Sequence, residues 1–130
     1  MRLYIGGNFQ GKFDYVKQIR NQEYPGNPVR VLDGEECLLN GPEQADILNH
    51  FHLLIRRLLK EGRNPAVFAE QVLAENPGIW IICDEVGMGI VPADAFEREY
   101  RETVGRCCCD LAKDAEQVVR IICGIGERIK

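Results

Sequence analysis

The sequence has one tryptophan, two histidines and no long hydrophobic run. A membrane-spanning helix needs about 20 consecutive apolar residues, and no segment approaches that length. The opening residues, MRLYIGG, offer neither the length nor the small-residue cleavage site of a secretory signal peptide. The formal net charge is −4 and the basic residues are scattered, so the basic field needed for general nucleic-acid binding is absent. We therefore expect a cytoplasmic protein with no membrane and no nucleic acid as a partner.

The chain has six cysteines but no C-x-x-C pair. Thiols normally stay reduced in the cytoplasm, so disulfides are not expected. Zinc sites in proteins usually have four ligands at workable spacing. Cys107, Cys108 and Cys109 are consecutive, and on a helix they would fan out over about 200°, too far apart to hold one ion. We expect these thiols, with Cys83 and Cys123 at strand ends, to be packing residues.

Apolar periodicity and Gly/Pro breaks divide the 130 residues into alternating strands and helices. Strands are predicted over 2–5, 29–33, 79–83 and 117–123, and helices over 12–20, 41–58, 64–73 and 94–112. This alternation predicts an α/β fold, a P-loop-like three-layer domain covering residues 1–130, with a mainly parallel sheet flanked by helices.

The longest predicted helix opens at Gly41-Pro42-Glu43, with Pro42 near its first position. Its apolar residues share one face of a helix, which indicates packing on a sheet: Ile47, Leu48, Phe51, Leu54, Ile55 and Leu58. His50 and His52 fall on opposite edges of that face. We therefore expect them to be ordinary helix-boundary residues without a catalytic role.

A glycine-rich stretch between the first strand and the first helix has the pattern G-x-x-x-x-G-K of a phosphate-binding loop. Backbone N–H groups at a helix start and the helix dipole favour an anion there, and a lysine adds a full positive charge. The candidate nucleotide-binding residues are Gly6, Gly7, Asn8, Phe9, Gln10, Gly11, Lys12 and Phe13. The alternative is a glycine turn that only joins a strand to a helix.

Phe13 stands where a phosphate-binding loop normally has Ser or Thr, the hydroxyl ligand of Mg²⁺. A nucleotide could still bind, with its Mg²⁺ site weakened. Asp33 ends one predicted strand and Glu85 lies just after another, at the carboxyl ends of the strands, where ligands bind in open α/β folds. We predict Lys12, Asp33 and Glu85 as catalytic residues, with Asp33 or Glu85 assisting the metal. The alternative for either acid is an ordinary strand-end carboxylate.

The segment EVGMGIVPADAFEREYRETVGR, Glu85 to Arg106, contains E-V-G, then G-I-V-P, then a predicted helix with G-R in it. This order matches a motif that begins N-E-V-G, except that Asp84 stands in place of the Asn. With the glycine loop, and a terminal strand, glycine and lysine, it resembles the adenosylcobinamide kinase / adenosylcobinamide-phosphate guanylyltransferase family of cobalamin biosynthesis. The resemblance covers roughly residues 1–20 and 79–130 well and the middle poorly.

The chain also departs from this family. Members are longer, and the absent part falls between the loop helix and Val29. In the family that part carries the histidine that accepts GMP covalently, so no guanylyltransferase nucleophile is visible here. Asp33 resembles the aspartate ending the family's next strand (V-D-C-L-T), but Gly34-Glu35-Glu36 does not continue the motif.

The resemblance implies a nucleotide-binding protein that transfers phosphoryl groups from ATP or GTP with Mg²⁺. Adenosylcobinamide is the implied acceptor, a homo-oligomer is implied, and the guanylyltransferase activity is expected to be lost. One alternative is a non-catalytic pseudoenzyme that binds a nucleotide or a corrinoid and acts through a partner. Another is a structural subunit with an empty loop. No motif that reads the nucleotide base is visible.

Overall fold

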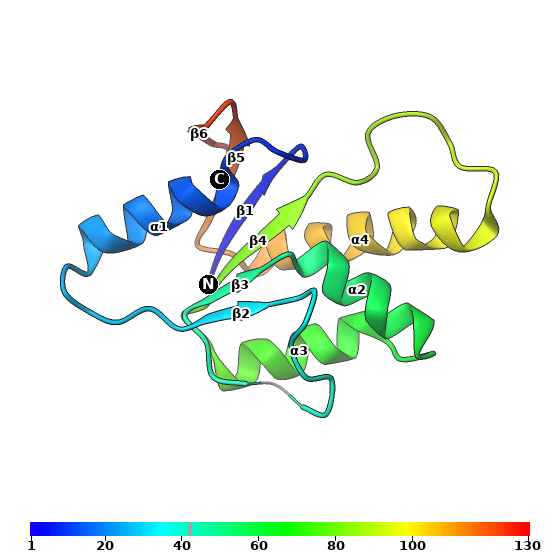
Figure 1. The fold of residues 1–130 in the computed structure, drawn as a ribbon, viewed down its shortest axis with the longest axis horizontal. Helices are drawn as coiled ribbons and strands as arrows, with labels where there is room; N and C mark the ends of the chain where they lie inside the picture. Colours follow the sequence, from blue (N-terminus) through cyan, green and yellow to red (C-terminus); the bar gives the residue numbers. More distant parts are fainter. Residues whose placement is uncertain (42) are drawn as a thin grey trace.

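The computed structural model describes residues 1–41 and 43–130, which form a six-stranded sheet with helices on both faces (Figure 1). The strands are β1 (Arg2–Gly6), β2 (Val31–Asp33), β3 (Ile47–Asn49), β4 (Trp80–Asp84), β5 (Gln117–Ile122) and β6 (Ile125–Arg128). Their order in the sheet is β2-β3-β4-β1-β5-β6. All neighbours are parallel except β5 and β6. The predicted α/β fold with a mainly parallel sheet is confirmed.

The helices are α1 (Lys12–Glu23), α2 (Phe51–Lys60), α3 (Pro65–Glu75) and α4 (Ala95–Asp114). Local sequence explains where two of them begin. The Asn64 side chain accepts a hydrogen bond from the Ala66 N–H at 2.9 Å, and Asp94 accepts one from the Glu97 N–H at 2.9 Å. In the described part of the chain, no helix is both long and apolar enough to cross a membrane.

Side chains alternate along the central strands between two hydrophobic clusters. Tyr4 and Trp80 pack with Val16 of α1 on one face. Leu3 and Ile81 pack on the other face with residues of α2, α3 and α4. A sheet covered on both faces accounts for the continuous apolar run of β4, whose five residues are all buried. Among the described residues, one helix thus covers one face of the sheet and three helices cover the other.

The predicted helix over 41–58 is wrong in its first half. Ile47, Leu48 and Asn49 form β3, which pairs with β2 and β4, and α2 begins only at Phe51. His50 separates the two elements with a left-handed backbone, φ 52° and ψ 42°. Pro42 lies outside the described residues. The apolar spacing misled because two adjacent apolar strand residues in front of an amphipathic helix fit the helical period.

The predicted last strand, 117–123, is one residue too long and is followed by a strand that the sequence pattern did not predict. Cys123 and Gly124 have φ values of 51° and 75° and form the tight turn of a hairpin. After them β6 pairs antiparallel with β5. Cys83 is buried as expected, whereas Cys123 and Cys109 are exposed, contrary to the prediction that they pack inside.

Candidate functional site

The glycine loop between β1 and α1 is bent by two left-handed residues. Phe9 has a φ of 56° and Gly11 a φ of 74°. The Phe9 side chain is 95% exposed. Gly11 is the N-cap of α1 and provides no side-chain bond to the helix. The first-turn N–H groups of α1 therefore keep their capacity to donate to an anion, which the helix dipole also favours.

An open pocket of about 230 Å³ lies along this loop. Its walls come from the loop, the start of α1, the end of β3 and the middle of β4. It is lined by Asn8, Phe9, Gln10, Gly11, Lys12, Phe13, Asp14, Asn49, His50 and Ile82. Most of the residues predicted to bind a nucleotide are thus brought to one concave surface. Gly6 and Gly7 are not among the lining residues.

Lys12 is buried, and its ammonium group is held inside the loop. Its Nζ donates to the Gly7 carbonyl at 2.6 Å and lies 2.8 Å from Asp84 Oδ1. Only 7% of the Lys12 side chain and 11% of the Asp84 side chain are exposed. The register of β1 and β4 pairs Gly6 with Asp84, which places this carboxylate beside the loop. The lysine is therefore fixed at the base of the pocket.

Phe13 faces the hydrophobic core under α1. Its half-buried ring packs against the cluster that contains Tyr4 and Val16, and Lys17 Nζ lies 5.3 Å from its centroid. The side chain thus belongs to the packing of the helix on the sheet. Position 13 provides no hydroxyl for a metal.

The hairpin of β5 and β6 supports the loop from one side. The Gly124 N–H donates to the Gln10 carbonyl at 2.9 Å, and the Cys123 N–H donates to Gln10 Oε1 at 2.7 Å. A side chain on Gly6 would place its Cβ 2.4 Å from the Ile121 carbonyl oxygen, so only glycine fits there. The loop is therefore held by the sheet, the helix and the hairpin together.

Asp33, at the end of β2, accepts a hydrogen bond from His50. His50 Nδ1 lies 2.9 Å and 3.0 Å from the two carboxylate oxygens, and the Asn49 amide donates to Oδ2 at 3.3 Å. Burial opposes ionisation of Asp33, but hydrogen bonds from the Glu35 N–H and from His50 outweigh it and hold the Asp33 pKa below its ordinary value. The carboxylate is therefore ionised at neutral pH.

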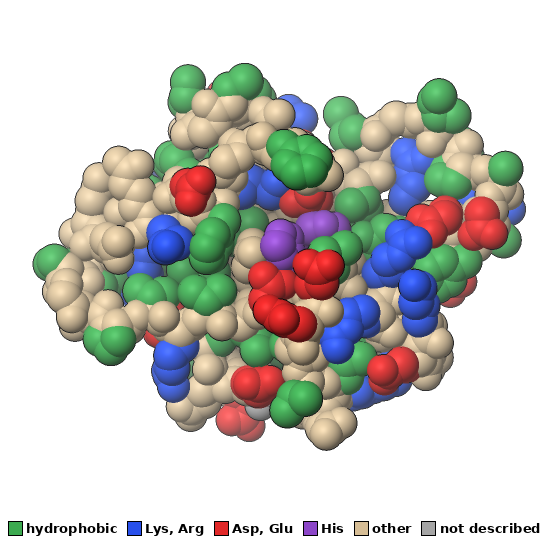
Figure 2. Space-filling view, in the orientation of Figure 1, with side chains coloured by type: hydrophobic (Ala, Val, Ile, Leu, Met, Phe, Trp, Pro, Cys, Tyr) green, Lys and Arg blue, Asp and Glu red, His purple; other side chains and the backbone are tan. Residues whose placement is uncertain are grey.

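His52 connects these two ends of the site. Its Nδ1 accepts a hydrogen bond from the Asp84 N–H at 3.3 Å, its Nε2 lies 3.7 Å from Asp84 Oδ2, and its ring centroid is 5.8 Å from that of His50. Burial lowers the His52 pKa, against the opposing charge of Asp84. Lys12, Asp84, His52, His50 and Asp33 thus form a continuous line across the strand ends, here called the polar row. Figure 2 shows the histidines at the middle of the visible face, beside acidic side chains.

Glu85 does not join the polar row. Its carboxylate binds Arg120 of β5, with Oε2 at 3.3 Å from Nε and 3.2 Å from Nη2. Its N–H donates to the Gly6 carbonyl at 2.9 Å, so its backbone still lies next to the loop. The structure therefore places Lys12 against Asp84, Asp33 against His50, and Glu85 apart from both. The catalytic and metal roles of Asp33 and Glu85 stay predictions.

Sequence reasoning missed Asp84 and both histidines. Asp84 is the last residue of β4, and choosing between it and Glu85 required the register with β1. The histidines were dismissed because they were assigned to one long helix, whereas His50 follows β3 and His52 is buried in the first turn of α2. The available signal was the polar pair Asn49-His50 at the end of an apolar triplet.

Comparisons with known proteins place the chain in a family. Residues 45–129 match the family described as cobinamide kinase / cobinamide phosphate guanyltransferase. The match spans more than half of the chain, so the chain belongs to this family. It includes α2 and α3, in the middle region where the motif resemblance is poor. It does not include the glycine loop or Asp33.

Two curated relatives carry the same name, "Bifunctional adenosylcobalamin biosynthesis protein CobU", and come from Salmonella typhimurium and Escherichia coli. Each is 42% identical to this chain over 50 residues. The aligned segment makes up 38% of this chain and only 28% of each relative. The family resemblance predicted from the sequence is thus confirmed, while the similarity to these two proteins is limited to a short part of each.

Proposed function

We propose that this member of the cobinamide kinase / cobinamide phosphate guanyltransferase family binds a nucleoside triphosphate at residues 6–13 and transfers a phosphoryl group in cobalamin biosynthesis. ATP or GTP is the donor, Mg²⁺ accompanies it, and a cobinamide such as adenosylcobinamide is the acceptor. A single domain over residues 1–130, a cytoplasmic location and a homo-oligomeric assembly are parts of the same proposal.

One observation carries this proposal: Lys12 is fixed at the N-terminus of α1 inside a glycine turn, with the Asp84 carboxylate at 2.8 Å. Phosphoryl transfer depends mainly on positioning and on positive charge near the transferred group. A helix N-terminus and a buried lysine supply both. Asp84 occupies a strand end, where a carboxylate can bind a hydrated metal ion, so it joins Asp33 and Glu85 as a candidate metal ligand.

Guanylyl transfer is not part of the proposed activity. The family histidine expected to accept GMP belongs to a segment that this sequence does not contain, because the chain passes from α1 to β2 through residues 24–30. We propose that the nucleotide-binding half of the chemistry remains and that guanylyl transfer is lost.

The position of Phe13 favours a second candidate, a non-catalytic protein that binds a nucleotide or a corrinoid. Its ring is committed to the core beneath α1, so a bound Mg²⁺ would lack the ligand that Ser or Thr normally provides. Loss of one ligand weakens the metal site but leaves the anion-binding backbone and Lys12 in place. Nucleotide binding separates the kinase and a nucleotide-binding pseudoenzyme from a structural subunit, and phosphate transfer separates those two from each other.

The first test is calorimetric titration of ATP and GTP, with and without Mg²⁺, into the wild type, Lys12→Met and Lys17→Met. A charge-assisted bond to phosphate contributes about 1.5–3 kcal/mol, so Lys12→Met should weaken binding by roughly ten- to a hundredfold. Lys17→Met removes one exposed positive charge from the same helix and is the matched control. Phosphate transfer from labelled ATP or GTP to adenosylcobinamide is then measured.

Lys12→Met leaves Asp84 without its partner, so its folding is checked by circular dichroism. The double variant Lys12→Met/Asp84→Asn removes both charges and should fold while binding nucleotide as weakly as Lys12→Met does. Binding and transfer that depend on Mg²⁺ and Lys12 support the kinase. Binding that ignores Mg²⁺, without transfer, supports the non-catalytic protein. No binding at millimolar nucleotide refutes the kinase and the nucleotide-binding form of the second candidate.

A further inference from the structure

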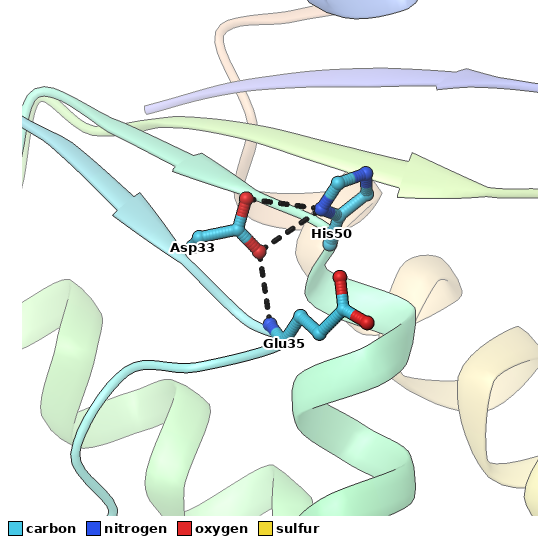
Figure 3. Close-up of side chains that lie close together, drawn as sticks. All are labelled: Asp33, Glu35 and His50. Atoms are coloured by element: carbon cyan, nitrogen blue, oxygen red, sulfur yellow. Dashed lines mark hydrogen bonds and ion pairs between the residues drawn. The ribbon is translucent and has the colours of Figure 1, made fainter.

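Three potential metal ligands meet at the Asp33 end of the polar row. One ligand atom from each of Asp33, Glu35 and His50 lies within 4.8 Å of the other two. Figure 3 shows both carboxylates on the side of the His50 ring nitrogen that bonds Asp33. Atoms bound to one ion about 2.0–2.2 Å away are themselves about 3–4 Å apart, so little movement would bring these three around a common centre.

The backbone holds these ligands close together. The Gly34 N–H donates to the Asn49 carbonyl at 2.9 Å, and a Cβ on Gly34 would lie 2.3 Å from the His50 carbonyl oxygen. The Asp33–Glu35 turn is therefore pressed against the start of α2. Asn49, 6% exposed, donates its amide to Asp33 Oδ2 and orients that carboxylate. Such supporting bonds are typical of metal ligands in proteins.

We propose that Asp33, Glu35 and His50 bind a divalent transition-metal ion, such as Mn²⁺, Co²⁺ or Zn²⁺, beside the phosphate loop. The ion binds to His50 Nδ1, whose proton moves to Nε2, and to one oxygen from each carboxylate. An imidazole ligand favours these ions over Mg²⁺, which prefers oxygen ligands and retains several waters. Three protein ligands leave a coordination position for water or for an oxygen of another molecule.

One of the three ligands, His50, lines the same pocket as the glycine loop, together with Lys12; Asp33 and Glu35 are not among its lining residues. An ion held there would place positive charge near a phosphate bound to the loop. This part of the inference rests on the proposed function. A metal ion bound by residues at the end of β2 and the start of α2 would then supply positive charge near the phosphate. Position 13, which is Phe, has no side-chain ligand to hold such an ion.

In the experiment, Co²⁺ and Mn²⁺ are titrated separately into the nucleotide-free protein. Binding of Co²⁺ is followed by its visible absorption, and binding of Mn²⁺ by its electron paramagnetic resonance signal. We expect one ion per chain and an affinity at least about tenfold lower in Glu35→Gln and in His50→Asn. Asn tolerates the left-handed backbone at position 50, so His50→Asn removes the ligand with little strain. Glu36→Gln, an exposed neighbour of the same charge, is the control and should bind normally.

Equal weakening by Glu36→Gln and Glu35→Gln would overturn the site, because it would show attraction to a diffuse acidic surface. Unchanged binding in His50→Asn would also overturn it. Lys17→Met, which removes an exposed charge from α1, should bind Co²⁺ as the wild type does. Metal binding without nucleotide binding refutes the proposed function alone, and nucleotide binding without Co²⁺ binding refutes this inference alone.

Discussion

The two ends of the polar row hold similar groups in different surroundings. Lys12 and Asp84 are buried between β1, β4 and the loop, with 7% and 11% of their side chains exposed. Asp33 and His50 sit at the edge of the sheet, where 29% and 40% are exposed. Charge buried without a partner destabilises a fold, whereas a half-exposed pair is compensated by water. The buried end should therefore serve folding and ligand binding together, and the exposed end should affect ligand binding alone.

The largest effect is expected from removing one partner of the buried ion pair between Lys12 and Asp84. Asp84→Ala leaves the Lys12 ammonium buried without a counter-charge, and we expect it to lower the free energy of unfolding by about 3–5 kcal/mol. Urea denaturation followed by circular dichroism measures this. The double variant Lys12→Met/Asp84→Asn should recover most of the loss. If Asp84→Ala unfolded at the wild-type urea concentration, the distinction between the two ends would fail.

A second prediction compares the two glycines that lie next to the two ends of the polar row, Gly6 and Gly34. A Cβ at Gly6 would lie 2.4 Å from the Ile121 carbonyl oxygen, between two paired strands, and one at Gly34 would lie 2.3 Å from the His50 carbonyl oxygen, in a turn. Strands β1 and β5 cannot separate easily, so Gly6→Ala should lower the free energy of unfolding by about 3 kcal/mol, the upper end for overpacking. Gly34→Ala should lower it less, because the turn can shift.

Gly105→Ala provides the control for both glycine substitutions. Gly105 lies inside α4, and a Cβ there would meet no atom within 4 Å, so alanine should stabilise the protein by about 0.5–1 kcal/mol through helix propensity. Thermal and urea unfolding of the three variants gives the order of their stabilities. A larger loss for Gly34→Ala than for Gly6→Ala would contradict the expected order.

The smallest effect is expected at His50. Its left-handed backbone costs roughly 1–2 kcal/mol for a residue with a side chain, and its half-exposed bond to Asp33 offsets about 0–1 kcal/mol. Glycine also loses about 0.5–1 kcal/mol more conformational entropy on folding, which opposes the relief of strain, so His50→Gly should change the free energy of unfolding by less than about 1 kcal/mol. His50→Ala should be less stable than His50→Gly, the reverse of their order in a helix interior. Equal stability of the two would mean that position 50 carries no backbone strain in solution.

The parts of the fold that local sequence determines were predictable. The apolar run of β4, the Asn64-Pro65 start of α3 and the glycine turn after β1 each have a local physical cause. β3 was missed because Ile47 and Leu48 continue the helical spacing of α2, and only pairing with β2 and β4 distinguishes the two states. A three-residue strand is specified by its neighbours in the sheet rather than by its own composition.

The kind of candidate site could be predicted from the sequence, but not all of the residues that form it. The rule that ligands bind at the carboxyl ends of parallel strands pointed to the ends of β2 and β4, where Asp33 and Asp84 lie in the structure. It could not select Asp84 over Glu85, because the choice depends on the register that pairs Gly6 with Asp84. It also could not place His50 beside Asp33, since that contact requires β2 and β3 to be neighbours. Long-range pairing decided each of these points.

The central place of β1 has a consequence for the order in which the protein can form. Arg2 lies beside Trp80 on one side and beside Gln117 on the other, so β1 emerges during synthesis long before either neighbouring strand. The glycine loop depends on a segment that is synthesised even later, because Gln10 accepts hydrogen bonds from the N–H groups of Cys123 and Gly124. Contacts this distant in the chain slow folding and leave an unpaired strand open to aggregation. The glycine loop therefore cannot take its final shape until the β5–β6 turn, whose Cys123 lies 113 residues further along the chain than Gln10, has been synthesised.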